Sequence, residues 1–182
     1  MKIHFGGNTK GVIVRPEYYR RIRVSILKLG HILTRDWIEK EINGLEKLKS
    51  QEIFDLTEKA IKEADAVVLE CSDDASSVGK QMLIALENSK PVLLLTTKLS
   101  SKGIGFVGKK YVGLVFKSRY NLVNIEKLLN KFFKWATNNQ KVSRFNLVID
   151  RKLDIYLRDK AKKNSTSKTE EIRKLIINDM EK

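Results

Sequence analysis

Two stretches, Ala66-Val67-Val68-Leu69 and Pro91-Val92-Leu93-Leu94-Leu95, decide the fold of most of this chain of 182 residues. A run of apolar residues without a polar interruption is typical of a strand that is covered on both faces. Between the two runs lies a helical pattern from about Gly79 to Asn88. Strand, helix and strand in this order indicate parallel pairing, so we expect an α/β fold: a parallel sheet with helices on both faces.

The same alternation extends over residues 1–138, which we expect to form one domain of the flavodoxin or Rossmann type. The further expected strands are 2–5, 31–34 and 111–116, and the further expected helices are 16–29, 50–63 and 122–135. Ligands bind such sheets outside the carboxyl ends of strands, near the point where the strand order reverses. Those ends are residues 6–11, residues 71–79 and the segment from Thr96 onward. Residues 135–142, with two Asn and a Gln, are the expected linker.

Residues 139–182 are expected to form a separate, smaller unit. Residues 143–150 alternate apolar and polar side chains, as a half-buried strand does. Asp150 can cap a first helix, and Ser167-Lys168-Thr169-Glu170 is a capping box that opens a second. The apolar stripes of the two helices are Leu153, Leu157 and Ala161, and Ile172, Leu175, Ile176 and Met180. So small a unit buries too little surface to fold alone, and we expect a homodimer or a higher even oligomer.

The net charge of +14 is concentrated in the second half of the chain. Residues 1–97 hold 15 Lys/Arg against 14 Asp/Glu, residues 98–140 hold 9 against 1, and residues 141–182 hold 12 against 7. This distribution favours a polyanionic partner, although a lysine-rich surface can also be simply hydrated and bind no partner. Because no apolar run approaches twenty residues and Cys71 is the single cysteine, we expect a cytoplasmic protein without a membrane span or a disulfide.

Several motifs in order resemble the nucleoside 2-deoxyribosyltransferase family, including its deoxynucleotide N-hydrolase branch. They are Phe5-x-Gly7 with Lys10-Gly11, Gly30-His31-Ile32-Leu33-Thr34, Ala64-Asp65 through Glu70, Val78-Gly79, Ala85 and Lys90-Pro91. The similarity spans about residues 1–97. It implies a fold that handles nucleosides or nucleotides and cleaves their N-glycosidic bond. In that family a glutamate after the Val-Gly pair attacks the anomeric carbon.

The chain departs from this pattern at the nucleophile, where it has Gln81. A neutral amide does not ionise and is a poor nucleophile, so we expect that the family's chemistry is lost. The family's second acid corresponds to Thr57, its tyrosine beside the sugar to His4, and its phosphate-contacting serines to Asn8 and Ala75. If activity survives, Glu70, Asp55 or Asp73 would have to supply the missing carboxylate.

The resemblance and the strand ends together predict a ligand site at the edge of the sheet. Its expected residues are His4, Gly6, Gly7, Asn8, Lys10, Glu70, Ser76, Ser77, Gly79 and Gln81. Glu70 could face the pocket as a reactive group or have a structural role in orienting a ribose hydroxyl. We expect no cofactor and no metal, because His4 and His31 show no metal-ligand spacing.

Residues 143–181 resemble the ribbon-helix-helix DNA-binding class of MetJ and Arc. In that class two chains pair their strands into a ribbon that enters the major groove. The resemblance implies that Arg144, Asn146 and Val148 face the bases, since Arg suits guanine, Asn suits adenine and Val offers apolar contact. It also implies a phosphate contact at Ser167, Lys168 and Thr169, which open the second helix. The alternative is a dimerisation hairpin with no role in DNA binding.

Two functions follow from the sequence. The first is a dimeric DNA-binding regulator. Its larger domain either senses a nucleoside, a nucleotide or a related molecule, or only brings the C-terminal units of several chains together. The second is an active nucleoside or nucleotide glycosidase, or a deoxyribosyltransferase, that uses a substitute carboxylate and whose C-terminal arm only dimerises.

Overall fold

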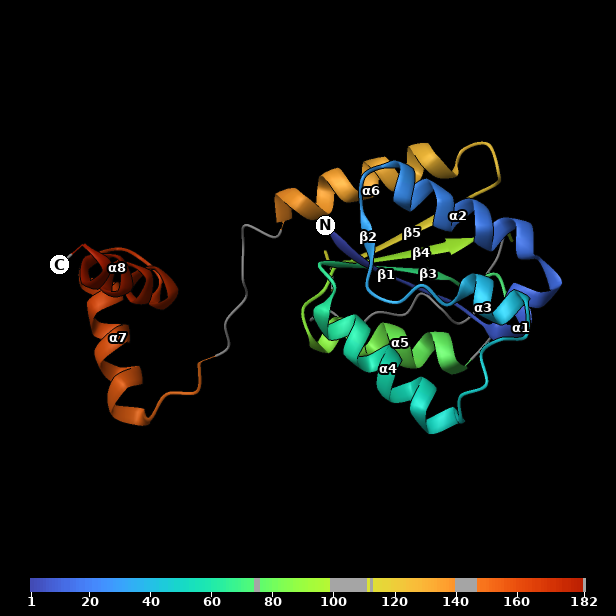
Figure 1. Ribbon diagram of the computed structural model, residues 1–182. Coiled ribbons are helices and arrows are strands. Elements are labelled where there is room, and N and C mark those ends of the chain that lie inside the picture. Colours follow the sequence, from blue (N-terminus) through green and yellow to red (C-terminus); the bar gives the residue numbers. More distant parts are fainter. Residues whose placement is uncertain (74–75, 99–110, 112, 140–146, 182) are drawn as a thin grey trace. The chain divides into compact units, whose positions relative to one another are not determined.

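The chain divides into two compact units, Met1–Val142 and Ser143–Lys182 (Figure 1). The structure is a computed structural model and describes residues 1–73, 76–98, 111, 113–139 and 147–181. None of the described helices is long and apolar enough to cross a membrane. Each unit is described by itself below.

The first unit contains a five-stranded parallel sheet with the strand order β2-β1-β3-β4-β5. Its strands are β1 (Lys2–Gly6), β2 (Ile32–Leu33), β3 (Ala66–Glu70), β4 (Val92–Thr96) and β5 (Val115–Arg119). This is the order of a flavodoxin-like doubly wound fold, whose order reverses between β1 and β3. The parallel α/β fold expected from the sequence is therefore confirmed.

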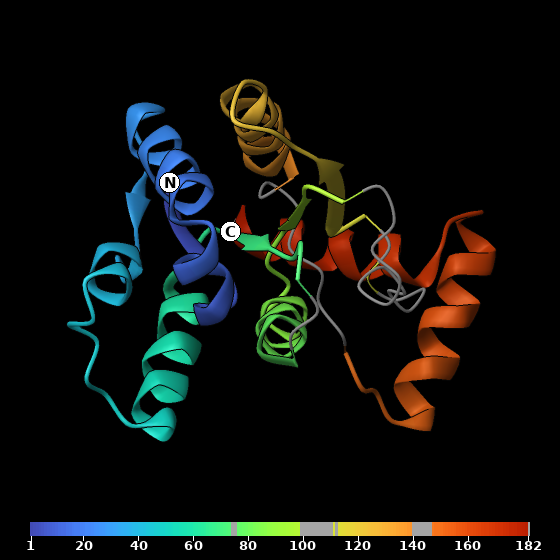
Figure 2. The ribbon, with the colours of Figure 1, turned by 90° about the vertical axis from the view of Figure 1, so that its right-hand side faces the viewer.

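Helices cover both faces of the sheet (Figures 1 and 2). The helices α2 (Pro16–Lys28) and α6 (Ile125–Asn139) lie on one face, and α4 (Ser50–Glu63) and α5 (Ser76–Glu87) lie on the other. Two short helices that the sequence pattern did not indicate, α1 (Thr9–Val14) and α3 (Ile38–Ile42), follow β1 and β2.

The apolar runs form two cores because successive side chains of a strand point to opposite faces. Val68, Leu93 and Leu95 pack in the cluster with α2 and α6, whereas Val67 and Leu94 pack in the cluster with α4 and α5. In β1, Ile3 and Phe5 belong to the first cluster. His4, between them, therefore faces the α4–α5 side, where the site described below lies.

Two boundaries differ from the expected ones. The fifth strand is Val115–Arg119 rather than 111–116, because this edge strand alternates partly buried side chains with exposed Lys117 and Arg119. Trp135 does not begin a linker: α6 continues to Asn139, and the Trp135 ring packs 4.3 Å from Phe116 and 5.9 Å from Phe132.

The second unit consists of two capped helices, α7 (Arg151–Lys163) and α8 (Lys168–Met180). As expected, Asp150 accepts a hydrogen bond from Leu153 N at 2.8 Å, and Ser167 accepts one from Glu170 N at 3.2 Å. The buried side chains of these helices are Leu157, Ala161 and Glu171. The expected strand begins outside the described residues, and its described part, residues 147–149, pairs with no strand in the single chain.

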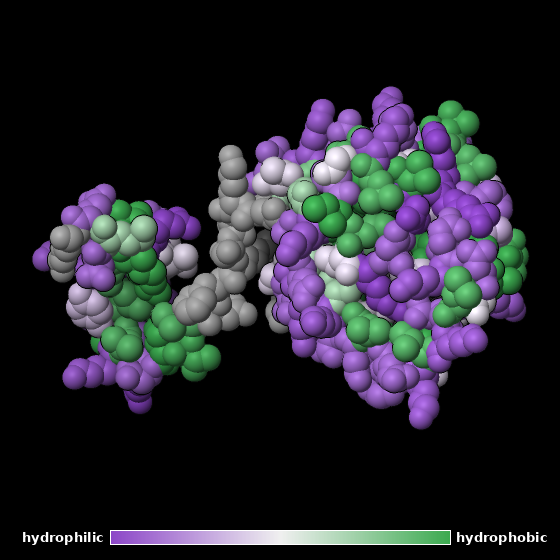
Figure 3. Space-filling model, viewed as in Figure 1, coloured by the Kyte–Doolittle hydropathy of each residue, from purple (hydrophilic) through white to green (hydrophobic). Residues whose placement is uncertain are grey.

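The second unit exposes much apolar surface, visible as green side chains along the unit in Figure 3. The exposed apolar residues are Leu147, Val148, Leu153, Ile155, Tyr156, Leu175, Ile176, Ile177 and Met180. Val148 is 96% exposed and Met180 is 81% exposed. A unit that leaves this much apolar surface in water has an incomplete core.

Candidate functional site

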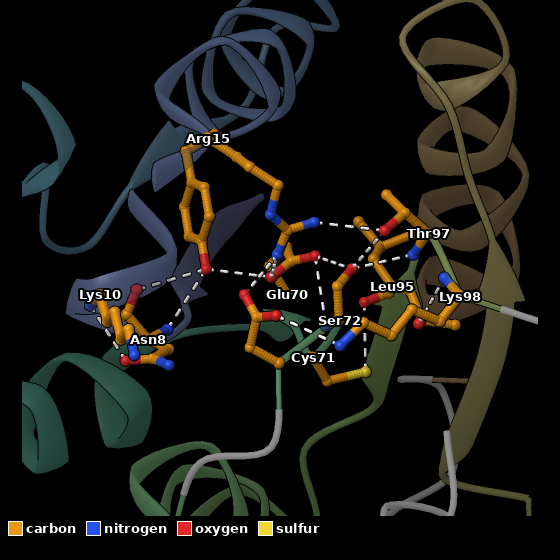
Figure 4. Close-up of polar contacts among 12 residues, drawn as sticks. Asn8, Lys10, Arg15, Glu70, Cys71, Ser72, Leu95, Thr97 and Lys98 are labelled. Carbon is orange, nitrogen blue, oxygen red and sulfur yellow. Dashed lines mark hydrogen bonds and ion pairs between the residues drawn. The ribbon is translucent and has the colours of Figure 1, made fainter. Parts of the chain in front are cut away.

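The buried carboxylate of Glu70 joins the chain segments that meet at the carboxyl edge of the sheet (Figure 4). Tyr19 and Tyr120 donate hydrogen bonds to it at 3.0 and 3.1 Å. The backbone N–H and the hydroxyl of Ser72 also donate to it. Burial and the neighbouring carboxylate raise the pKa of both tyrosines far above the ordinary value, so both phenols stay protonated and donate.

Arg15 extends this network toward the surface. Its guanidinium lies 3.6 Å from Glu70, donates to Thr97 Oγ1 at 3.2 Å and pairs with Asp73 at 2.6 Å. Lys98 reaches the other oxygen of Asp73 at 3.3 Å. Burial raises the pKa of the Asp73 carboxyl, but the hydrogen bond and charge of Arg15 outweigh that effect and hold the pKa below the usual range. The acids Glu70 and Asp73 are thus both engaged in structural pairs.

Gln81 of α5 lies against the end of β1 and is held at both ends of its amide. Its Nε2 donates to the Gly7 carbonyl at 3.4 Å, and its Oε1 lies 3.1 Å from His4 Nε2. A Cβ atom on Gly6 would overlap Gln81 Oε1 and lie 2.9 Å from His4 Nε2. Gly6 therefore provides the space that the amide occupies.

These contacts fix the protonation of His4. The Gly7 carbonyl can only accept, so the amide nitrogen of Gln81 must face it and the amide oxygen must face His4. His4 Nε2 then carries the proton, and Nδ1 is a bare acceptor. Burial lowers the pKa of His4 to about 4, so the ring is neutral at physiological pH. A glutamate in place of Gln81 would set a carboxylate oxygen against the Gly7 carbonyl, so this position suits an amide.

A cavity of about 110 Å³ opens beside Gln81. It is lined by His4, Gly7, Thr9, Arg35, Trp37, Glu41, Glu46, Ile53, Thr57, Ser77 and Gln81. An adjoining groove of about 410 Å³ between α4 and α5 shares Ile53, Thr57, Ser77 and Gln81 with it. The groove adds the apolar Phe54 and Ile84 and the polar Ser50, Gln51, Ser76 and Lys80. The two hollows are therefore neighbours.

The structure brings some of the expected ligand residues together and leaves others apart. His4, Gly7, Ser77 and Gln81 line the cavity, Gly6 lies beneath them, and Ser76 lines the groove. The remaining four residues line neither hollow. Asn8 caps α1, Lys10 and Gly79 lie beside the site without facing it, and Glu70 belongs to the buried network.

The three expected substitute acids do not line the cavity that contains Gln81. Glu70 and Asp73 are engaged with Arg15, and Asp55 is exposed on α4, where it accepts from Gln51 at 2.8 Å. The acids that do line the cavity are Glu41 and Glu46, which the sequence analysis missed. Both come from residues 38–49, a short helix and an irregular segment that show no periodic pattern to identify them.

Arg35 and Glu46 form a shielded ion pair in the cavity wall. Their side chains are 15% and 8% exposed and lie 3.1 Å apart. Arg35 also donates to the Thr57 hydroxyl at 3.4 Å. Thr57 is thus a neutral member of the wall. The described residues contain no group of three His, Cys, Asp or Glu side chains able to hold a metal ion.

The residues expected to contact DNA are only partly described. Arg144 and Asn146 lie outside the described residues. Val148, Lys168 and Thr169 are exposed, although Lys168 pairs with Asp154 at 2.6 Å. Ser167 serves as the cap of α8.

The chain is similar in fold to solved protein structures. A Clostridium botulinum CMP N-glycosidase, BcmB, superposes with a TM-score of 0.54 at 14% sequence identity, over 72% of this chain and 99% of that chain. The two proteins share a fold. No family model matches the chain, and no curated protein matches it.

The packing around Gln81 predicts opposite effects for two glycine substitutions. Gly6→Ala should destabilise the first unit by about 1–3 kcal/mol, because the new methyl group overlaps the amide of Gln81. Gly79→Ala is the matched control: a Cβ there meets no atom within 4 Å, so the helix should gain about 0.5–1 kcal/mol. Urea unfolding measures both, and equal effects of the two changes would contradict the assigned packing.

The buried His4 predicts a loss of stability in acid. Its pKa is about 4 in the folded chain and 6.5 in the unfolded chain. As the pH falls below 6.5, the imidazole of the unfolded chain takes up a proton that the folded chain does not bind until about pH 4. The native state should therefore lose about 3 kcal/mol from about pH 7 to about pH 4 through this residue. The difference in unfolding free energy between wild type and His4→Asn across that range isolates the effect. His31→Asn, at a partly buried histidine, should give a smaller difference; an equal one would show that His4 is not the group.

Proposed function

We propose that the first unit binds a nucleoside or nucleotide without cleaving it, and that the second unit pairs with a second copy and binds DNA. The protein would then be a transcriptional regulator that senses the small molecule. The observation that carries the first half is the amide of Gln81, held by His4 and Gly7 where a glutamate nucleophile would be needed.

The shape of the hollow supports a nucleoside-sized ligand. The cavity and groove lie beside the strand-order reversal, where ligands bind in doubly wound sheets. Ile53, Phe54 and Ile84 offer apolar surface to a ring, and Ser76, Ser77 and Gln81 offer hydrogen-bonding groups beside it. Most small-molecule sites combine apolar walls with a few polar groups in this way. The solved structure that shares the fold acts on CMP, which is a nucleotide.

The exposed apolar surface of the second unit supports pairing with a second copy. In that unit Leu147 and Leu153 are 51% and 49% exposed, and Ile176 is 55% exposed. Covering them would complete a core that two helices alone do not provide. A ribbon of two strands, one from each chain, would use the residues before α7 that find no strand partner in the single chain.

The charge distribution supports DNA as the partner of the paired units. Residues 141–182 carry 12 Lys/Arg against 7 Asp/Glu. Arg144, Asn146 and Val148 would be the residues that read base edges, and Ser167, Lys168 and Thr169 would lie near a phosphate. The glutamates Glu170 and Glu171 in the first turn of α8 oppose that phosphate contact.

Ligand binding without cleavage is the first test. Wild-type protein mixed with a panel of nucleosides and their 5′-monophosphates should bind at least one of them by calorimetry. Chromatography of the same mixtures should find no released base, because a neutral amide cannot form the glycosyl ester. Lys127→Gln, at an exposed residue of α6 outside both hollows, should bind as wild type does. Stoichiometric or catalytic release of free base would contradict the proposal.

Selection from a randomised DNA duplex pool at near-physiological salt is the second test. A short enriched motif, palindromic or tandem, is expected, and Arg144→Ala should relax base preference by about 1–3 kcal/mol if its contact is bidentate. Ile176→Asp should abolish both dimerisation in analytical ultracentrifugation and specific binding. Val123→Asp, at an exposed residue of the first unit, should alter neither. Retention of DNA without an enriched motif would reduce the second unit to a dimerisation element.

One observation favours the second candidate function, an N-glycosidase. Glu41 and Glu46 place two carboxylates in the wall of the cavity beside Gln81. A carboxylate can activate a water molecule for attack at the anomeric carbon without a covalent intermediate. The base-release assay described above separates this function from simple binding.

A further inference from the structure

The wall of the cavity beside Gln81 includes a carboxylate that no described residue of the protein pairs with. Glu41 of α3 lines the cavity, and its side chain forms no hydrogen bond or ion pair with the described residues. The other acid of the wall, Glu46, is neutralised by Arg35 at 3.1 Å. The lining therefore carries one uncompensated negative charge, and it belongs to a group that can only accept hydrogen bonds.

His4 supplies a second acceptor without a donor. Its Nε2–H is used by Gln81, which leaves Nδ1 as the bare nitrogen. Nδ1 is buried and has no hydrogen-bond partner among the residues that the structure describes, and His4 lines the cavity. A buried acceptor without a donor is costly, and such groups in native structures call for a specific explanation.

Most strong donors of the cavity wall are engaged with protein acceptors, which leaves the neutral hydroxyls of Thr9 and Ser77. Both ends of the Gln81 amide are occupied, Trp37 Nε1 donates to the Phe5 carbonyl at 2.8 Å, and Arg35 is shared between Glu46 and Thr57. No cation among the lining residues is left to neutralise an anion. A phosphate in this cavity would meet the charge of Glu41 without a compensating partner.

We infer that the cavity receives the amino-bearing edge of a nucleobase, with Glu41 as the residue that selects it. The inference rests on the proposed binding of a nucleoside or nucleotide. An exocyclic amino group brings two N–H donors and, unlike a hydroxyl, presents no strong acceptor to the carboxylate. A cavity of about 110 Å³ holds only part of such a ligand, and the sugar lies in the adjoining groove between α4 and α5.

Pairs of nucleosides that have an amino group in one member and an oxo group in the other, with the neighbouring ring nitrogen changing from acceptor to N–H donor, test this assignment. Isothermal calorimetry of the full chain with cytidine and uridine, and with adenosine and inosine, should give a preference for the amino member of about tenfold or more. The oxo member lacks the amino donors and sets a carbonyl oxygen against the carboxylate. Glu41→Gln should remove most of this preference, because the neutral amide can donate as well as accept.

Glu17→Gln is the matched control, because Glu17 is exposed on α2 and does not line the cavity. It should keep the wild-type preference. Equal affinity of wild type for the amino and oxo members overturns the inference while leaving nucleoside binding intact. A preference that persists in Glu41→Gln also overturns it. Binding to none of the four nucleosides or their 5′-monophosphates overturns the proposed ligand class itself.

Discussion

The buried carboxylate of Glu70 is the constraint on which the sheet edge depends. A charge removed from water is costly unless it is paired and hydrogen-bonded, and Glu70 meets this requirement through Tyr19, Tyr120, Ser72 and Arg15. These partners come from α2 and its cap and from the segments that follow β3 and β5. One acceptor therefore sets the spacing of segments that are up to 105 residues apart in the chain, from Arg15 to Tyr120. Removing the carboxylate would leave several oriented donors unsatisfied at once.

Because Glu70 is committed to this network, the chemistry of the hollow depends on other groups. The hollow begins on the opposite side of β1, where the alternation of the strand turns His4 toward α4 and α5. Gly6 leaves room there for the Gln81 amide, whose two ends match the donor of His4 in β1 and the carbonyl acceptor of Gly7 just after it. A carboxylate only accepts hydrogen bonds, so it would match the donor of His4 but not the carbonyl of Gly7. An amide at position 81 thus matches the local hydrogen-bond pattern better than a carboxylate would.

The sequence predicted the parts of the structure that local patterns determine. Continuous apolar runs identified β3 and β4, and capping residues located the starts of α7 and α8. The predicted bounds of the edge strand β5 were wrong. Its partly buried residues alternate with Lys117 and Arg119, so an apolar run did not mark its position. The cavity wall could not be predicted. It joins His4, Arg35, Glu46 and Thr57 from four separate segments, and Glu41 and Glu46 belong to a segment without periodicity.

The two units differ in how much of their apolar surface each buries by itself, and this difference bears on how the chain works. The first unit has two complete cores, one on each face of the sheet. The second buries Leu157, Ala161 and Glu171 but leaves Leu153 and Ile176 about half exposed. If a second copy covers that surface, as we propose, the folding of the second unit is linked to its association and depends on concentration. A ligand in the first unit could then affect DNA binding by changing association alone, without any contact between the ligand and the DNA-binding residues.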